Sequence, residues 1–522
     1  MESNLEQQLE QLVENDISSL LKGALRGIEK EGLRVDYLGQ LSQKEHPEGL
    51  GSALTNGTVT TDFSEALLEF VTPVFDDGAA ALQFLESLHQ FTYGQLSEEL
   101  IWAGSMPCHI HNSEAIPVAW YGSSNIGRLK HIYRVGLEHR YGKMMQTIAG
   151  IHYNFSLPDV FWRSFQELRG NTDSLQSFRS SGYFKMIRNF RRYSWLLLYL
   201  FGASPAVDAS FLKGKSHPLH SLSDRTLYLP YATSLRMSDL GYSTKAQSSL
   251  NICFNHLNTF IASLDKAIHT PYPPYERIGV KVDGQYRQLS SSVLQIENEY
   301  YSDIRPKRGI RSGEKPLAGL RASGVEYIEV RLLDNNPFLP VGIDHRQTLF
   351  LDAFLISCLL MSDAVLCPAE CRLVIDNQHK VLTRGREPGL LLVTPQGEST
   401  LVGTGKALIE KIKMTGEVLD RVHRKKEYSL AVDEQLRKLE DPNLTPSARM
   451  LAALQKTGQE YTEWILQKSR EHKEFLLGST PDAAILRDLA GKAEESLRQQ
   501  QQLEAGDTIN FEQFLAEYLA YA

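Results

Sequence analysis

Two segments of this chain alternate between apolar and polar side chains with the two-residue period of a β-strand. Residues 150–156 (GIHYNFS) place His152 on the polar face, and residues 325–332 (VEYIEVRL) place Glu329 and Arg331 together on theirs. Successive side chains of a strand point to opposite faces, so each segment can bury its apolar side and present the other. Taken singly, either polar face could lie against water. The pattern predicts half-buried strands and leaves the purpose of their polar faces open.

The tripeptide Glu29-Lys30-Glu31 raises the same question more sharply. The residues after Gly27 have the pattern of a strand, so both carboxylates point to one face of it and Lys30 points to the other. Two like charges held close together raise each other's pKa unless a cation lies between them. Carboxylate oxygens are also the ligands that hard cations such as Mg²⁺ prefer. Most surface carboxylates have no such role, so the pair indicates a metal site only if other segments supply more ligands.

Residues 60–73 supply two more acids, Asp62 and Glu69, around a hydrophobic run. Alone, they fit a capped element whose carboxylates face solvent. Strand faces that converge in a curved sheet, however, could gather five carboxylates only around several divalent cations. Such a site is typical of phosphoryl transfer, in which Mg²⁺ neutralises ATP and an arginine stabilises the transferring group. The set comprises Glu29, Glu31, Asp62, Glu69 and Glu329, together with His152 and Arg331.

Strand-like runs and helices are mixed irregularly from residue 26 to about residue 400. A doubly wound parallel sheet would need regular alternation, so the sequence favours an α+β fold with a mainly antiparallel sheet. Beyond about residue 404 the chain becomes helical, charged and rich in glutamine. We therefore expect a catalytic α+β domain in residues 1–400 and a helical region in residues 401–522 that packs on it.

Composition and the N-terminus indicate a cytoplasmic protein. The first 25 residues read as an acidic amphipathic helix, with Leu5, Leu9, Leu12 and Val13 on one stripe, and lack the basic and apolar regions of a secretory signal. A net charge of -8 argues against a general nucleic-acid or membrane-surface role. The five cysteines are scattered, which fits a reducing compartment. We expect neither nucleic acid nor membrane as a partner.

Many separate strings of the chain match one enzyme family. The chain resembles the glutamate–cysteine ligases of the proteobacterial type, which catalyse the first step of glutathione synthesis. The matching strings cover most of residues 22–345, and the resemblance is much weaker beyond about residue 350. They are residues 26–31 (RGIEKE), 51–55 (GSALT), 61–70 (TDFSEALLEF), 105–108 (SMPC), 121–128 (YGSSNIGR), 150–156 (GIHYNFS), 201–205 (FGASP), 229–242 (LPYATSLRMSDLGY), 294–298 (LQIEN), 304–308 (IRPKR) and 327–331 (YIEVR).

This resemblance implies a fold and a reaction. The family's fold is a curved antiparallel sheet that forms a cup, related to the catalytic sheet of glutamine synthetases, with helices outside. In the family's reaction, the γ-carboxylate of L-glutamate attacks the γ-phosphate of ATP, and the amine of L-cysteine then displaces phosphate from the acyl phosphate. The resemblance also implies several Mg²⁺ or Mn²⁺ ions per site and a monomeric enzyme.

The resemblance also implies a role for individual residues. The metal-ligating set is matched by Glu29, Glu31, Asp62, Glu69, His152 and Glu329. Arg331 matches the arginine placed against the transferring phosphoryl group, which suits its permanently charged fork. Arg236 matches a substrate-binding arginine, and Tyr133, Gln146, Tyr242 and Tyr301 match the lining of the cysteine pocket. Without the resemblance, ordinary packing would explain the three tyrosines.

Two other functions fit the same residues. A related carboxylate–amine ligase with a different acceptor amine would activate its carboxylate with ATP in the same way, and would differ only in the acceptor pocket. A binding protein without turnover could use the acids to hold ions structurally, and it would release no phosphate from ATP.

Overall fold

A mainly antiparallel sheet lies at the centre of the computed structural model. The structure describes residues 5–241, 247, 250–310, 314–395 and 397–520. Within them the sheet has seven strands in the order β11-β12-β5-β1-β3-β2, with β4 paired to the end of β1. All of these pairings are antiparallel, which confirms the predicted α+β class with an antiparallel sheet. The strands are β1 (Leu25–Asp36), β2 (Val59–Thr61), β3 (Leu67–Val71), β4 (Glu99–Ile101), β5 (Gly150–Ser156), β11 (Ile304–Lys307) and β12 (Tyr327–Asp334).

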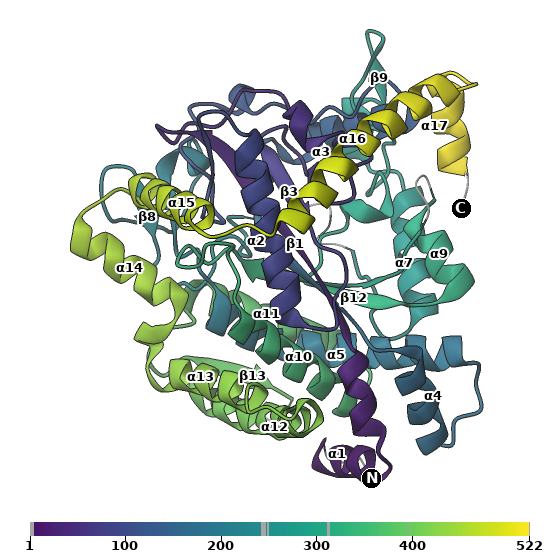
Figure 1. The fold of residues 1–522 in the computed structure, drawn as a ribbon, viewed down its shortest axis with the longest axis vertical. Helices are drawn as coiled ribbons and strands as arrows, with labels where there is room; N and C mark the ends of the chain where they lie inside the picture. Colours follow the sequence, from purple (N-terminus) through teal and green to yellow (C-terminus); the bar gives the residue numbers. More distant parts are fainter. Residues whose placement is uncertain (1–4, 242–246, 248–249, 311–313, 396, 521–522) are drawn as a thin grey trace.

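Helices surround this sheet, and among the described residues three small sheets lie outside it (Figure 1). The α-helices described in full before residue 400 are α1 (Leu5–Glu14), α2 (Gly78–Gln95), α3 (Asn125–Tyr141), α4 (Asp159–Leu168), α5 (Leu175–Phe201), α7 (Leu257–His269), α8 (Pro273–Ile278), α9 (Pro316–Ser323), α10 (His345–Leu360) and α11 (Pro368–Arg384). The small sheets are built from β6 (Ala206–Asp208), β7 (His220–Ser221) and β8 (Thr226–Tyr228), from β9 (Lys281–Val282) and β10 (Gln285–Tyr286), and from β13 (Leu391–Thr394) and β14 (Gly397–Thr400).

The register of the central sheet aligns the acidic residues. Glu29 of β1 lies opposite His152 of β5, and Glu31 lies opposite Glu69 of β3. β12 pairs with the other edge of β5 and brings Glu329 to the same face, with a register irregularity between Val330 and Leu333. Residues that are directly opposite in neighbouring strands have Cβ atoms about 4.5–5.5 Å apart. Pairing of the strands therefore makes neighbours of residues that are far apart in the sequence.

The other face of the sheet is apolar and packs against helices. Five side chains on this face are fully buried in one cluster: Ile151, Tyr153 and Phe155 of β5, and Ile328 and Val330 of β12. Helices α2, α5 and α10 supply much of the rest of this cluster. The strand alternation predicted from the sequence is thus confirmed, because the apolar face of each strand forms the core.

Lys30 also points to the helix-covered face, as predicted. Its Nζ lies 3.0 Å from Nε2 of His89 on α2, and the side chain is buried. Burial lowers the pKa of Lys30 to about 7. The predicted N-terminal helix is shorter than expected: α1 ends at Glu14, and a 3₁₀ segment spans Ile17–Gly23. Asp16 breaks the helix with a left-handed backbone (φ 55°).

The chain beyond residue 400 is helical, as predicted. It forms α12 (Leu401–His423), α13 (Tyr428–Glu440), α14 (Pro446–Thr457), α15 (Tyr461–Gly478), α16 (Ala483–Gly506) and α17 (Phe511–Ala520). α12 and α13 pack on α10, whereas α16 reaches α2 and α17 reaches α3 at the other end of the molecule (Figure 1). Leu408 and Ile412 of α12 share one apolar cluster with Phe350 of α10. A domain division near residue 400 stays a prediction.

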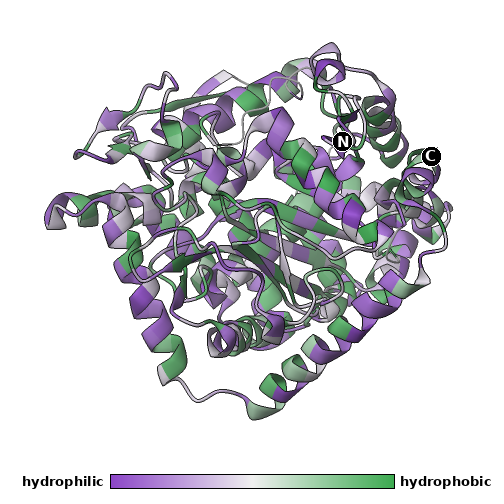
Figure 2. Ribbon diagram, turned by 90° about the horizontal axis from the view of Figure 1, so that it is seen from above, coloured by the Kyte–Doolittle hydropathy of each residue, from purple (hydrophilic) through white to green (hydrophobic). Residues whose placement is uncertain are grey.

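Apolar residues gather along the central sheet, and polar residues line much of the outer surface of the surrounding helices (Figure 2). Within the described part of the chain, no helix is both long and apolar enough to cross a membrane.

A buried ion pair joins the sheet to α10 and gives a stability prediction. Arg26 and Asp352 lie 2.7 Å apart with side chains 3% and 2% exposed, and Tyr153 donates to Asp352 at 2.7 Å. Asp352→Asn leaves the buried guanidinium without its counter-ion and should lower the unfolding free energy by about 3 kcal/mol. Asp159→Asn is the matched control, because Asp159 pairs with Arg179 but is 60% exposed, and it should cost less than about 1 kcal/mol. Urea unfolding measures both; equal losses would contradict the argument.

Candidate active site

His152 lies at the centre of the acidic cluster. Its Nδ1 is 3.1 Å from Oε2 of Glu29 and 3.5 Å from Oε1 of Glu329, and its Nε2 is 3.7 Å from Oε1 of Glu31. Glu69 adjoins Glu31 on the neighbouring strand. The residues predicted as ligands on four different strands therefore occupy one face of the sheet.

Hydrogen bonds from the same sheet orient two of the carboxylates. The backbone N–H of Gly150 donates to Oε2 of Glu31 at 2.7 Å, and Nδ2 of Asn154 donates to Oε1 of Glu29 at 2.8 Å. Both donors belong to β5, so the strand that carries His152 also fixes the acids beside it. Such support holds the carboxylate oxygens in place before any ligand binds.

Burial and mutual repulsion raise the pKa of two of the acids. Burial raises the pKa of Glu31 and Asp62 adds to it, and together they outweigh the opposing effect of His152 and the nearby arginines. Burial raises the pKa of Glu69 well above its usual value, and Glu29, Asp62 and Glu31 add to the effect. These carboxylates are crowded together and lack enough positive charge to ionise easily. A divalent cation among them would remove that penalty.

Two other acids are ionised more readily because of nearby cations. Burial raises the pKa of Glu329, but Arg331, Lys307 and His152 outweigh it and hold the pKa well below its usual value. Nη1 of Arg331 donates to Oε1 of Glu329 at 2.9 Å, and Nζ of Lys307 lies 3.5 Å from the same oxygen. Burial and Glu329 raise the pKa of Glu29, but the hydrogen bond with His152 helps to hold it below its usual value.

The donor set fits a hard divalent cation. Ligand atoms of Glu29, His152 and Glu329 all lie within 4.8 Å of one another. Oε2 of Glu329 is buried and has no hydrogen-bond partner among the described residues, which is the state expected of an oxygen reserved for a ligand. Carboxylate oxygens suit Mg²⁺ and Mn²⁺, and one imidazole is compatible with Mn²⁺.

A small cavity of about 80 Å³ adjoins the acidic cluster. Its lining includes Glu31, Asp62 and Arg331 of the predicted site, and also Tyr133, Gln146 and Tyr301. The hydroxyl of Tyr301 lies 3.4 Å from Oε1 of Gln146. The structure thus brings three of the four predicted cysteine-pocket residues together. Tyr242 lies outside the described residues.

Arg236 lies beside this cavity rather than in its wall. Its Nη2 donates to the carbonyl of Arg331 at 3.0 Å, and its Nη1 is 3.5 Å from Oδ1 of the buried Asp334. A Cβ on Gly150 would come within 1.8 Å of Nη2 of Arg236. Residue 150 must therefore be glycine for the guanidinium to occupy this position at the edge of the cluster.

Sequence reasoning missed several residues of this cavity. Arg305 lines it and lies in the basic segment 305–308, whose charge was a usable signal. Burial lowers the pKa of Arg305 to about 10, and the neighbouring Arg331 adds to this. Arg134 also lines the cavity and donates to the carbonyl of Asp62. It lies one residue from the predicted Tyr133 on α3, but nothing in its local sequence distinguishes it. The cavity also includes Phe63, Leu137, Met145, Ile148, Asn298 and Glu299.

Comparison with known proteins identifies the family. The family model described as glutamate–cysteine ligase matches residues 9–381. The glutamate–cysteine ligase of Pseudomonas fluorescens is 48% identical, over 99% of this chain and 98% of the relative. The chain belongs to the glutamate–cysteine ligase family. The glutamate–cysteine ligase of Hahella chejuensis is likewise 48% identical, over 95% of each chain. The predicted resemblance is confirmed, and the chain is a ligase of this type.

Solved structures of related ligases share the fold. The glutamate–cysteine ligase of Francisella tularensis, determined in complex with AMP, superposes with a TM-score of 0.90 at 38% identity, over 95% of this chain and 98% of that one. A bifunctional glutathione synthetase from Pasteurella multocida superposes with a TM-score of 0.70 at 25% identity, and the match covers 89% of this chain and 55% of that one. The glutamate–cysteine ligase fold therefore also forms about half of a longer protein.

Proposed function

We propose that this ligase joins the γ-carboxylate of L-glutamate to the amine of L-cysteine, at the expense of ATP and through a γ-glutamyl phosphate. The observation that carries the proposal is the convergence of Glu29, Glu31, Glu69 and Glu329 on His152 and Arg331, in a member of the glutamate–cysteine ligase family. A carboxylate oxygen of glutamate attacks the γ-phosphorus of ATP and ADP leaves. The cysteine nitrogen then attacks the acyl carbon, loses a proton, and phosphate departs.

The basic residues of the chain have separate roles in this proposal. Arg331 stabilises negative charge on the transferring phosphoryl group, because its guanidinium is held by Glu329 on the same face as the acids. Arg236 binds an oxygen of glutamate or of the acyl phosphate. When bound, Mg²⁺ or Mn²⁺ ions would neutralise the triphosphate. The residues that would hold them are Glu29, Glu31, Asp62, Glu69, His152 and Glu329.

The small cavity is the proposed cysteine pocket. Tyr133, Gln146 and Tyr301 supply two phenols and an amide around a space of about 80 Å³, and Nε2 of Gln146 is buried without a hydrogen-bond partner in the described part of the chain. Tyr242 is assigned to the same pocket from its sequence alone. A compact pocket of this kind favours a small amino acid over a larger acceptor.

Phosphate release tests the proposed reaction. The enzyme is incubated with ATP, Mg²⁺ and glutamate, and release is compared without an acceptor and with cysteine, alanine or ammonium. We expect strong stimulation by cysteine and loss of turnover with EDTA. Stimulation by another amine instead would make the chain a ligase with a different acceptor. Zero turnover with a melting temperature insensitive to EDTA would overturn the metal-dependent ligase altogether.

Gly150→Ala tests the placement of Arg236. The added Cβ would displace the guanidinium, so we expect the KM for glutamate to rise about tenfold, or about 1.4 kcal/mol of binding. Gly491→Ala is the matched control, because no atom lies within 4 Å of its added Cβ, and its kinetics should match the parent enzyme. Steady-state kinetics with glutamate as the varied substrate measure both variants. If the KM for glutamate is unchanged in Gly150→Ala, the proposal that Arg236 binds glutamate is wrong.

A further inference from the structure

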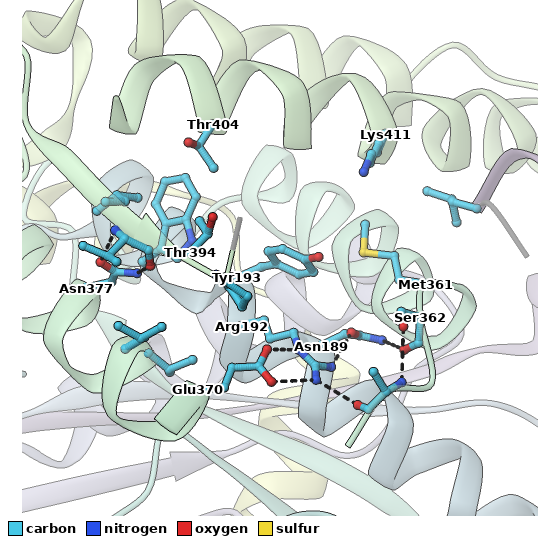
Figure 3. Close-up of a pocket in the computed structure, with 18 residues that line it drawn as sticks. Asn189, Arg192, Tyr193, Met361, Ser362, Glu370, Asn377, Thr394, Thr404 and Lys411 are labelled. Carbon is cyan, nitrogen blue, oxygen red and sulfur yellow. Dashed lines mark hydrogen bonds and ion pairs between the residues drawn. The ribbon is translucent and has the colours of Figure 1, made fainter. Parts of the chain in front are cut away.

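A second, larger cavity lies away from the acidic cluster. Its volume is about 650 Å³, and it shares no lining residue with the small cavity beside Arg331. It lies between α5 and α11 on one side and α12 on the other, with β13 closing one end (Figure 3). A volume of this size is typical of sites for small organic ligands. The proposed ligase reaction does not use it.

The polar groups along its floor are already paired with one another. Arg192 makes a forked contact with Glu370, at 2.6 Å to Oε1 and 3.2 Å to Oε2. Asn189 accepts from Arg192 and donates to backbone carbonyls, and Asn377 both donates to and accepts from the backbone of Val393. The charges of Arg192 and Glu370 cancel, so the floor presents no net charge.

The roof presents two polar groups that lack such partners. Thr404 and Lys411 extend from α12 into the cavity, across from the Arg192–Glu370 pair (Figure 3). Within the described part of the chain, Oγ1 of Thr404 is buried without a hydrogen-bond partner, and Lys411, whose side chain lines the cavity but is exposed, has no ion pair. The two residues are seven apart on one helix, so they share a face and are separated by about 10 Å along its axis.

Apolar side chains form one part of the lining, beside the polar groups. Trp195, Met361, Val374 and Leu392 line the cavity, and the ring of Tyr193 projects into its middle. Aromatic and aliphatic walls of this kind take a flat apolar body, while a few polar groups set its orientation. The charged lining groups sum to one positive charge, that of Lys411, in a protein with a net charge of -8. A complementary ligand therefore carries a negative charge at one end.

We propose that this cavity is a second binding site, which takes a small aromatic organic anion. The anionic group, a carboxylate or a sulfonate, pairs with Lys411. The aromatic body lies against Trp195 and Leu392, and a polar atom at its far end reaches Thr404.

Fluorescence of 8-anilinonaphthalene-1-sulfonate, an aromatic anion, tests the site. We expect one probe molecule to bind per chain, and Lys411→Gln to raise its Kd about tenfold. Lys406→Gln is the matched control, because Lys406 is on the same helix but pairs with Glu440 and does not line the cavity. Thr404→Phe, which fills the space with a ring, should abolish binding. Melting temperatures verify that each variant is folded. Binding that is unaffected by both Lys411→Gln and Thr404→Phe would overturn the proposal.

Competition experiments test two points: whether binding requires a negative charge or only an apolar ring, and whether the probe binds outside the ligase site. 2-Naphthoate should displace the probe, and the neutral 2-naphthamide should be about tenfold weaker because it cannot pair with Lys411. Equal displacement by the two compounds would overturn the requirement for an anion. Saturating ATP and glutamate should leave the probe bound. Displacement by those substrates would locate the probe in the ligase site and overturn the proposal of a second one.

Discussion

Replacing Glu329 by glutamine is expected to lower kcat about a thousandfold, equivalent to about 4 kcal/mol of transition-state stabilisation. Glu329 is 1% exposed and provides the buried, unpartnered Oε2 of the cluster as well as the oxygen that holds Arg331. A neutral amide is a poor ligand for Mg²⁺, and it also releases the guanidinium from its anchor. Phosphate release over a range of Mg²⁺ concentrations should show both the lower rate and a higher Mg²⁺ requirement.

The folded state should tolerate this change far better than the reaction does. Glutamine keeps the shape of the side chain, and the loss of one negative charge relieves repulsion on Glu29. The partner left behind, Arg331, is 22% exposed and can be hydrated, unlike Arg26 beside Asp352, so we expect the unfolding free energy to fall by no more than about 1–2 kcal/mol. Glu326→Gln, an exposed substitution just before the same strand, should change neither property. Parallel losses of activity and stability in Glu329→Gln would show that Glu329 serves the fold rather than the metal.

The sequence was most informative wherever a strand has one apolar face. The two-residue period in residues 150–156 and 325–332 correctly places His152, Glu329 and Arg331 on the face opposite the core. That period arises from the geometry of the strand itself, so it can be read without the fold. It also predicts that Glu29 and Glu31 share a face.

What the sequence could not supply was the register between strands. Glu31 meets Glu69, and Glu29 meets His152, only because β1 pairs with β3 and β5 at those exact positions. A shift of one residue would turn every side chain of a strand to the other face. Arg134 shows a second limit, because it reaches the cavity from a helix whose period gives no hint of a ligand. For such residues the resemblance to a family, or the structure, is needed.

Replacing Arg331 by lysine is expected to lower kcat about a hundredfold, or about 2.7 kcal/mol, while the KM for ATP and for glutamate changes less than threefold. The guanidinium lies among acids, with Nη1 2.9 Å from Glu329 and 3.4 Å from Nδ1 of His152. Glu329, Glu31 and Glu29 raise the pKa of Arg331, although burial opposes them. Lysine keeps the positive charge but concentrates it on one nitrogen and lacks the planar fork, so it cannot reproduce the paired contacts to Glu329 and a phosphoryl oxygen.

The division between kcat and KM is what makes this variant decisive. An arginine that acts on the transferring phosphoryl group contributes mainly in the transition state, so its loss lowers kcat. An arginine that only helps to bind a substrate would raise KM and leave kcat almost unchanged. Arg321→Lys provides the control, because Arg321 is 49% exposed and only faces Asp265 at 3.9 Å, and we expect parental kinetics from it. A change confined to KM in Arg331→Lys would show that Arg331 acts in ground-state binding and not in the chemical step. The phosphoryl group would then need another cationic partner, and Arg305 lines the same cavity.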